Sequence, residues 1–169
     1  FIAGDVVFSE DRAAPSGEID TALVTAGIEA RLAPSVVGGV AVTGSWFEAG
    51  DDVRSFDGDG VGAAAYLGVA GDIFYANAVL GYMAHSYTSE RPVFNGTSVV
   101  DATGGTDADQ VYAAVEAGMN IDLGRGGEFG PLVRIRTSST EIEAYTEEGA
   151  GAFSVAVADR TVDQTTGTL

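Results

Sequence analysis

The chain has 169 residues and a formal net charge of −17, from 25 acidic residues against 8 basic ones, all of them arginine. A field this negative repels nucleic acid, so no nucleic-acid partner is expected, and it argues against electrostatic binding to anionic lipid. The absence of cysteine rules out a disulfide scaffold and thiol chemistry. Hydrophobic residues make up 46% of the chain. No apolar run approaches the roughly 18 residues of a membrane helix, which leaves a soluble all-β protein or a membrane β-barrel.

Alternating apolar and polar residues predict β-strands along the whole chain. Helix-period patterns with caps are nearly absent. The predicted strands span, in order, residues 2–9, 18–32, 36–48, 60–70, 72–88, 109–123 and 129–145, with an eighth starting near Thr161 and running to Leu169. Tight turns are predicted at 33–35, 70–72 and the Gly-rich 124–127.

Three features of this pattern favour an antiparallel up-and-down transmembrane β-barrel over a soluble sandwich. The strands are longer than the usual 5–6 residues of soluble sheets, and they match the length that crosses a membrane. Long polar connections at 9–17, 48–60 and 89–108 alternate with short turns, as in bacterial outer-membrane barrels. One face of each strand is apolar, while the other is small and weakly polar, as a lumen should be. We expect one domain over residues 1–169.

Charged residues within the strands are predicted to line the lumen. Arg134 and Arg136 share a strand face, and Glu116 lies beside them if their two strands pair. Glu29 and Arg31 are interpreted in the same way. A charged group facing lipid would cost about 2–4 kcal/mol at the midplane. These residues either line a polar channel that holds a helix or a passing chain, or form an ion-pair network that stiffens the barrel.

No catalytic residues, metal site or cofactor are predicted. His85 is the only histidine, and no serine has the Gly-x-Ser-x-Gly surroundings of a nucleophile elbow. The acidic run at 57–60 lacks the downstream glutamate of a calcium loop. Aromatic residues near strand ends suggest a girdle at the membrane interface, namely Trp46, Phe47, Phe74, Tyr75, Tyr82 and Tyr87.

The C-terminal third resembles the autotransporter β-domain. A Gly-Pro-apolar strand at 130–136 (GPLVRIR) is followed at 142–152 by IEAYTEEGAGA, which is similar to the family's aromatic residue before a Thr/Ser-Glu-x-Gly-Ala loop. The stretch 153–160 and the upstream order of strands also fit. The motif loop comprises Tyr145, Thr146, Glu147, Glu148, Gly149 and Ala150.

The resemblance implies a larger barrel, of twelve strands with a helix threading its lumen, of which this chain is about the N-terminal two-thirds. It implies a type V secretion role, in which the barrel anchors or exports an N-terminal passenger such as a GDSL-type esterase or a protease. The implied partners are outer-membrane lipid, that passenger and the outer-membrane assembly machinery. Two other functions remain open: a binding module that uses its long loops, and a hydrolase.

Overall fold

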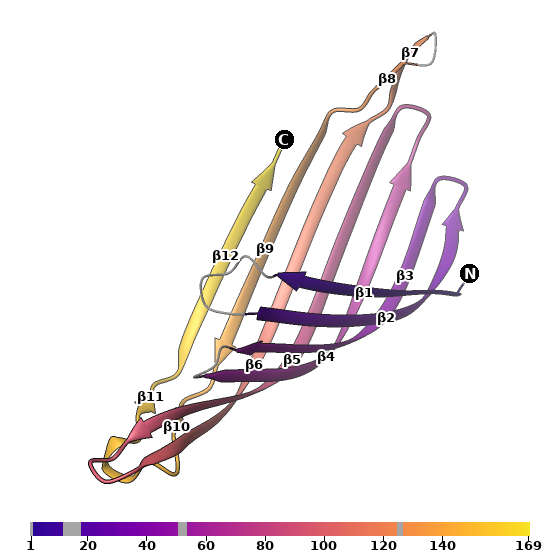
Figure 1. The fold of residues 1–169 in the computed structure, drawn as a ribbon. Helices are drawn as coiled ribbons and strands as arrows, with labels where there is room; N and C mark the ends of the chain where they lie inside the picture. Colours follow the sequence, from indigo (N-terminus) through magenta and orange to yellow (C-terminus); the bar gives the residue numbers. More distant parts are fainter. Residues whose placement is uncertain (1, 12–17, 51–53, 125–126) are drawn as a thin grey trace.

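The fold is a single curved sheet of antiparallel strands. The computed structural model describes residues 2–11, 18–50, 54–124 and 127–169. The eight strands of the sheet follow one another in chain order: β1 (Ile2–Asp11), β2 (Glu18–Ala33), β3 (Val36–Gly50), β4 (Ser55–Ala70), β5 (Phe74–Phe94), β6 (Val99–Met119), β9 (Leu132–Ile142) and β12 (Arg160–Thr168). Figure 1 shows the sheet bent into an open trough, and β1 and β12 form its two ends.

Two small hairpins lie beyond the ends of β9. β7 (Ile121–Gly124) pairs with β8 (Gly127–Phe129) in the connection between β6 and β9. β10 (Tyr145–Thr146) pairs with β11 (Ala156–Val157), and the single 3₁₀ turn η1 (Gly151–Phe153) lies between them. No helix in the described ranges is long and apolar enough to cross a membrane.

The predicted fold class is confirmed, and the eight strands of the sheet correspond in order to the eight predicted from the sequence. The predicted long connections are wrong in two places, where the strands continue instead. β5 and β6 run on as a ladder to a tight turn at 95–98, where Asn95 Oδ1 accepts hydrogen bonds from the Thr97 and Ser98 amides at 3.0 Å. Gly96, with φ of +94°, completes this turn. Asp, Ser, Thr and Gly suggested loops, but cross-strand pairing overrides that local preference.

Parts of three predicted connections, at 12–17, 51–53 and 125–126, lie outside the described residues. β3 extends to Gly50 and β4 begins at Ser55, so little of the predicted 48–60 loop remains as a connection. A true long connection is present at 143–159, where a strand had been expected to continue to residue 145. We call the end of the sheet at the 95–98 turn the extended end.

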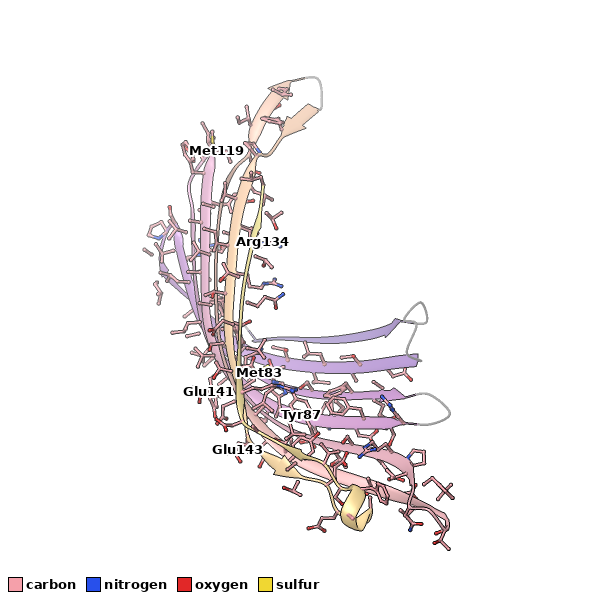
Figure 2. All side chains as sticks on the ribbon, turned by 90° about the vertical axis from the view of Figure 1, so that its left-hand side faces the viewer. Met83, Tyr87, Met119, Arg134, Glu141 and Glu143 are labelled. Atoms are coloured by element: carbon pink, nitrogen blue, oxygen red, sulfur yellow. The ribbon has the colours of Figure 1, made fainter. Side chains whose placement is uncertain are left out.

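The ladder register sorts side chains onto two faces. Ile28, Val40, Ala65 and Leu80 form one cross-strand row on the convex face, and large apolar side chains there are open, with Leu80 60% exposed. The other face is concave, and in Figure 2 the labelled Tyr87 lies on that side while Glu141 lies on the convex side. Because exposing so broad an apolar band to water costs free energy, the convex face is the side suited to contact with lipid.

Tyrosine rings lie flat across glycines on the concave face. Tyr66 on β4 crosses Gly39 on β3, and its hydroxyl donates to Glu29 Oε2 on β2 at 3.1 Å. A Cβ atom at Gly39 would overlap the Tyr66 ring. The same arrangement places Tyr112 over Gly81. Small residues therefore make room for rings that would otherwise stand up from the sheet.

Candidate functional site

The candidate site is the concave face, because all five polar residues predicted to line a lumen lie on it. Two neighbouring cross-strand rows carry them. One row joins Glu29, Gly39, Tyr66, Val79, Ala114 and Arg136. The other joins Arg31, Val37, Gly68, Asn77, Glu116 and Arg134. The convex face at the same height carries Val, Leu, Ile and Ala, together with Gly38 on β3 and Thr137 on β9.

Glu116 and Arg134 form an ion pair between neighbouring strands. β6 pairs with β9, and the register sets Glu116 directly opposite Arg134. Arg134 Nε donates to Glu116 Oε2 at 2.6 Å, and its Nη2 contacts the same oxygen. The side chains are 17% exposed for Glu116 and 45% for Arg134. This pair suits the stiffening role, since both charges are already compensated across the ladder.

The structure does not bring all five residues together. Glu29 and Arg31 lie on β2, four strands away from Glu116 on β6, a separation of roughly 19 Å along the sheet at about 4.8 Å per strand. Arg136 lies one row from the Glu116–Arg134 pair. Within the part of the chain that is described, Arg31 and Arg136 make no hydrogen bond or ion pair. The charges therefore flank the trough on both sides, with neutral residues between them.

The predicted aromatic girdle is wrong for three of its six residues, which do not face the apolar convex side. Trp46, Phe74 and Tyr82 are exposed on the convex face, where the Tyr82 hydroxyl donates to Asp109 at the border between apolar and acidic residues. Phe47, Tyr75 and Tyr87 point to the concave face instead. Adjacent residues such as 46 and 47 must face opposite sides of a strand, so both could not belong to one girdle.

The motif loop at 145–150 belongs to a strap, residues 143–159, that runs along the edge of the β6 extension and reaches over its concave side with the Tyr145 and Glu147 side chains. Thr103 and Glu148 exchange two backbone hydrogen bonds of 3.0 and 2.8 Å, and the Glu143 amide donates to the Asp107 carbonyl at 2.9 Å. The Tyr145 ring covers Gly104, where a Cβ atom would overlap it. The strap thus continues β9 along the edge of β6 that β9 itself does not reach.

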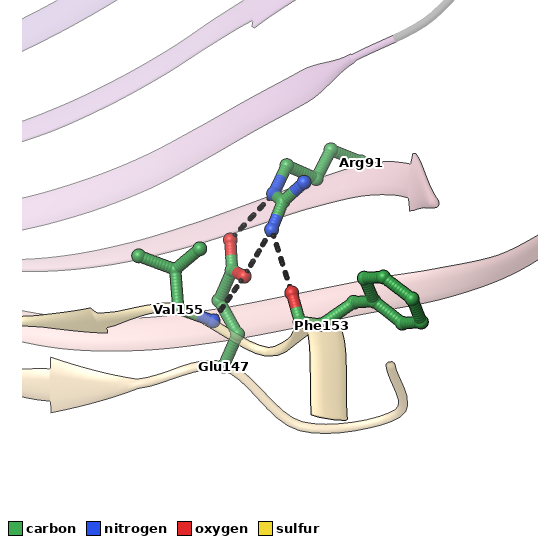
Figure 3. A network of polar contacts seen from close by, with 4 residues as sticks. All are labelled: Arg91, Glu147, Phe153 and Val155. Atoms are coloured by element: carbon green, nitrogen blue, oxygen red, sulfur yellow. Dashed lines mark hydrogen bonds and ion pairs between the residues drawn. The ribbon is translucent and has the colours of Figure 1, made fainter. Parts of the chain in front are cut away.

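A bidentate ion pair fastens the strap, as Figure 3 shows. Arg91 on β5 donates from Nε to Glu147 Oε1 at 2.8 Å and from Nη2 to Oε2 at 2.6 Å. The Val155 amide donates to Glu147 Oε2 at 2.9 Å, and Arg91 Nη2 reaches the Phe153 carbonyl at 3.4 Å. The Arg91 hydrogen bonds lower the pKa of Glu147 from 4.5 to about 2, despite burial that leaves the residue 8% exposed.

Two of the three buried apolar residues of the described chain, Ala102 and Ala150, lie at the strap, and the third, Ala108, lies opposite Ile142 of β9. Ala102, Ala108 and Ala150 are 1%, 2% and 4% exposed. Ala102 lies directly opposite Arg91 in the ladder, beneath the ion pair. Gly149 has φ of +90°, and a Cβ atom there would overlap the Asp101 carbonyl oxygen. The motif residues are therefore structural parts of this strap, a role that their order in the sequence did not reveal.

The single histidine of the chain, His85, lies on the concave face. His85 stacks on Tyr87, with ring centroids 5.6 Å apart. Among the residues described, no group of three or more His, Cys, Asp or Glu side chains gathers there in a way that would hold a metal ion.

The comparisons with known proteins decide the family. A model of the "Autotransporter beta-domain" matches residues 2–169. The chain belongs to the autotransporter β-domain family. Members of this family reside in the bacterial outer membrane, and the convex apolar band agrees with that location. No curated protein matched the chain.

Two solved structures share the fold. The translocator domain of the autotransporter NalP from Neisseria meningitidis superposes with a TM-score of 0.79 at 16% identity, over 98% of this chain and 56% of that one. The ferric yersiniabactin uptake receptor FyuA from Yersinia pestis gives 0.53 at 13% identity, over 92% of this chain and 26% of that receptor. The chain therefore spans little more than half of the NalP translocator domain.

Proposed function

We propose that this chain is the main part of a translocator that anchors and exports an N-terminal passenger across the bacterial outer membrane. The membership of the autotransporter β-domain family supports this role. In this proposal residues 1–169 act as a single domain without catalytic residues of its own. Its partners are outer-membrane lipid, the machinery that inserts barrels into that membrane, and a passenger such as a GDSL-type esterase or a protease.

One observation carries the proposal: at the same height along the strands, the two faces of the sheet differ in polarity. Val40 and Leu80 point outward, whereas the residues just before them in the chain, Gly39 and Val79, share a concave row with Glu29 and Arg136. A soluble binding module would expose its apolar band to water, at a cost of about 25 cal/mol per Å² of apolar surface. A barrel in lipid covers this band and keeps the polar rows for its lumen.

The polar residues of the concave face have separate roles in this proposal. Glu116 and Arg134 stiffen the wall, since each is neutralised by the other. Arg31 and Arg136 make no hydrogen bond or ion pair within the described residues, and they are available to carboxylates or carbonyl groups of a polypeptide in the lumen. Arginine is suited to this, because its planar fork pairs with carboxylate in two-point contacts.

The test is to express the full-length protein that carries this chain in a Gram-negative host. We expect the barrel to migrate differently on a gel before and after boiling, and a tag on the passenger to be accessible to antibody on intact cells. A cooperative soluble monomer without detergent would overturn the membrane assignment. A folded barrel whose passenger stays inside the cell would overturn the export role.

A further inference from the structure

Three aromatic rings lie side by side on the concave face near the extended end, and a fourth, Tyr145, lies over the next strand of the sheet, β6. Phe47, Phe56 and Tyr87 come from β3, β4 and β5, with ring centroids 5.4–5.6 Å apart. Tyr145 of the strap covers Gly104 on β6, and Gly104 stands in the same cross-strand row as Phe56. These four residues, which we call the aromatic arc, span four adjacent strands.

The arc is built into the sheet. Phe47 and Tyr87 both rest on Gly58, where a Cβ atom would overlap the Phe47 ring and lie 2.7 Å from the Tyr87 ring. The strap that carries Tyr145 is locked by the Arg91–Glu147 pair. Phe56 nevertheless remains 41% exposed. The rings are therefore fixed in place while part of their apolar surface stays open to the interior of the trough.

Charge distinguishes the arc from the convex surface behind it. In the rows that alternate with those of the arc, the convex face carries Glu48, Asp57, Asp59 and Asp107. On β3 to β6 the concave side chains at this height are neutral at pH 7 apart from the titratable His85, and they comprise Ser, Gly, Ala, Thr and aromatic residues. The nearest charges are the mutually paired Arg91 and Glu147 beside Tyr145, and Arg160 at the β12 end of the His85 row. The acidic residues on the convex side indicate that the arc lies beyond the part of the barrel that contacts lipid. Lipid is therefore not the ligand expected at the arc.

We propose that the aromatic arc is a contact site for the extended polypeptide that leaves through the barrel, an inference that rests on the proposed function. Fixed rings can stack with apolar and aromatic side chains of many sequences. A neutral lining does not repel acidic segments, although the chain as a whole is strongly acidic. A chain in transit therefore meets the arc at the last part of the concave face before the extended end.

Photo-crosslinking in the full-length protein tests the arc. A benzophenone amino acid replaces Phe56, and the matched control carries it at Trp46, an aromatic position on the convex face of the neighbouring strand. Export is arrested with a passenger that contains an engineered disulfide loop. We expect adducts between position 56 and the passenger in the arrested state, severalfold above those from position 46, and their loss when the disulfide is reduced and export is completed.

Other outcomes overturn the inference. Adducts that do not depend on arrest would identify a resident segment as the occupant, and adducts with lipid alone would place the level in the membrane. Equal passenger adducts from positions 46 and 56 would remove the preference for the concave face. In all three cases a passenger displayed normally at the cell surface leaves the proposed function intact, whereas a passenger that never reaches the surface would refute that function.

A second variant separates contact from proximity. With the crosslinker at Ser89, which lies between Phe56 and Gly104 in one row, Phe56→Ala should lower the passenger adducts severalfold. Heat-modifiable migration verifies that the barrel is folded, as expected for a substitution at a partly exposed ring. Unchanged adducts from Ser89 in the folded variant would show that the ring itself does not bind the polypeptide.

Discussion

The β5–β6 pair passes through two environments, and its two halves are stabilised differently. In the half near the 71–73 turn, Leu80 and Val115 are open on the convex face, and the described residues bury almost nothing apolar against protein. At the extended end the chain buries Ala102 and Ala150 at the strap that the Arg91–Glu147 pair fastens, and Ala108 is buried further along β6, opposite Ile142 of β9. The first half therefore depends on lipid for apolar burial, whereas the second carries its own packing into water.

Charge follows the same division. The arginines within the described strands all lie on the concave face, as the register shows for Arg31, Arg91, Arg134, Arg136 and Arg160. On β3 to β6 the acidic residues of the convex face lie beyond the apolar band, as at Asp107 and Asp109, whereas Asp163 on β12 shares a row with Val111. Whether a position tolerates a charged side chain should therefore depend on its face of the sheet and on its distance from the extended end. Substitutions can test each dependence.

The largest effect is expected from placing a charge on the lipid side. Leu80→Arg should destabilise the folded barrel by about 2–4 kcal/mol, because the guanidinium faces hydrocarbon. Val79→Arg, one residue away, points into the concave face in the row of Arg136 and should cost much less. Urea titration in lipid vesicles, followed by heat-modifiable migration, measures both variants. Equal losses for the two would show that the faces are not distinguished by lipid.

A smaller loss of stability is expected from adding a side chain to a glycine that a tyrosine ring covers. Gly39→Ala would push its Cβ into the Tyr66 ring and separate the Tyr66 hydroxyl from Glu29, at a cost of about 1–3 kcal/mol for overpacking. Gly105→Ala is the matched control, because its nearest neighbour would be the Tyr87 carbonyl oxygen at 3.8 Å. If the control loses as much stability as Gly39→Ala, glycine is needed for a reason other than the ring.

The strap should open locally without unfolding the barrel. Glu147→Gln removes the charge that pairs with Arg91, and we expect the open population of residues 143–159 to rise at least about tenfold, as for loss of charge-assisted hydrogen bonds. Glu148→Gln makes the same chemical change at an exposed side chain whose strap contacts are backbone ones. Hydrogen exchange of the Glu147 and Val155 amides compares the two. Unchanged exchange in Glu147→Gln would mean that the ion pair does not fasten the strap.

The smallest effect is the pH dependence of the same strap. The folded pKa of Glu147 is about 2, below its ordinary value of 4.5, so its contribution is present above pH 4.5 and is lost as pH falls towards 2. We expect strap exchange to depart from the intrinsic acid dependence of amide exchange in this window. The departure should be absent from Glu147→Gln, and its persistence there would assign it to another group.

Period-two patterning was sufficient to predict the sheet and its polar face. It placed Glu29, Arg31, Glu116, Arg134 and Arg136 on one side without any knowledge of register, because a strand must alternate. It did not predict how far apart β2 and β6 would lie across the sheet. Nor did it predict the extensions to Phe94 and Val99, because polar residues in a ladder above the membrane resemble a loop in composition.

The role of the motif loop was the least accessible to sequence reasoning. Glu147 pairs with Arg91, which lies 56 residues earlier in the chain. The sequence around either residue does not indicate that the two pair. The glycines covered by aromatic rings were equally hard to predict, since Gly104 and Tyr145 come into contact only when the strap lies beside β6. Once the register of the strands is known, glycines that lie beside aromatic residues of the neighbouring strand indicate where the rings lie flat on the sheet.

The most direct test of the two-faced sheet is a spin-label scan along β5. The chain contains no cysteine, so single cysteines introduced at each position from 76 to 82 can be labelled without a background. In lipid vesicles we expect accessibility to oxygen at the even positions and to a water-soluble nickel complex at the odd positions. Water accessibility on both faces would contradict the account, because the convex band would then not be covered by lipid.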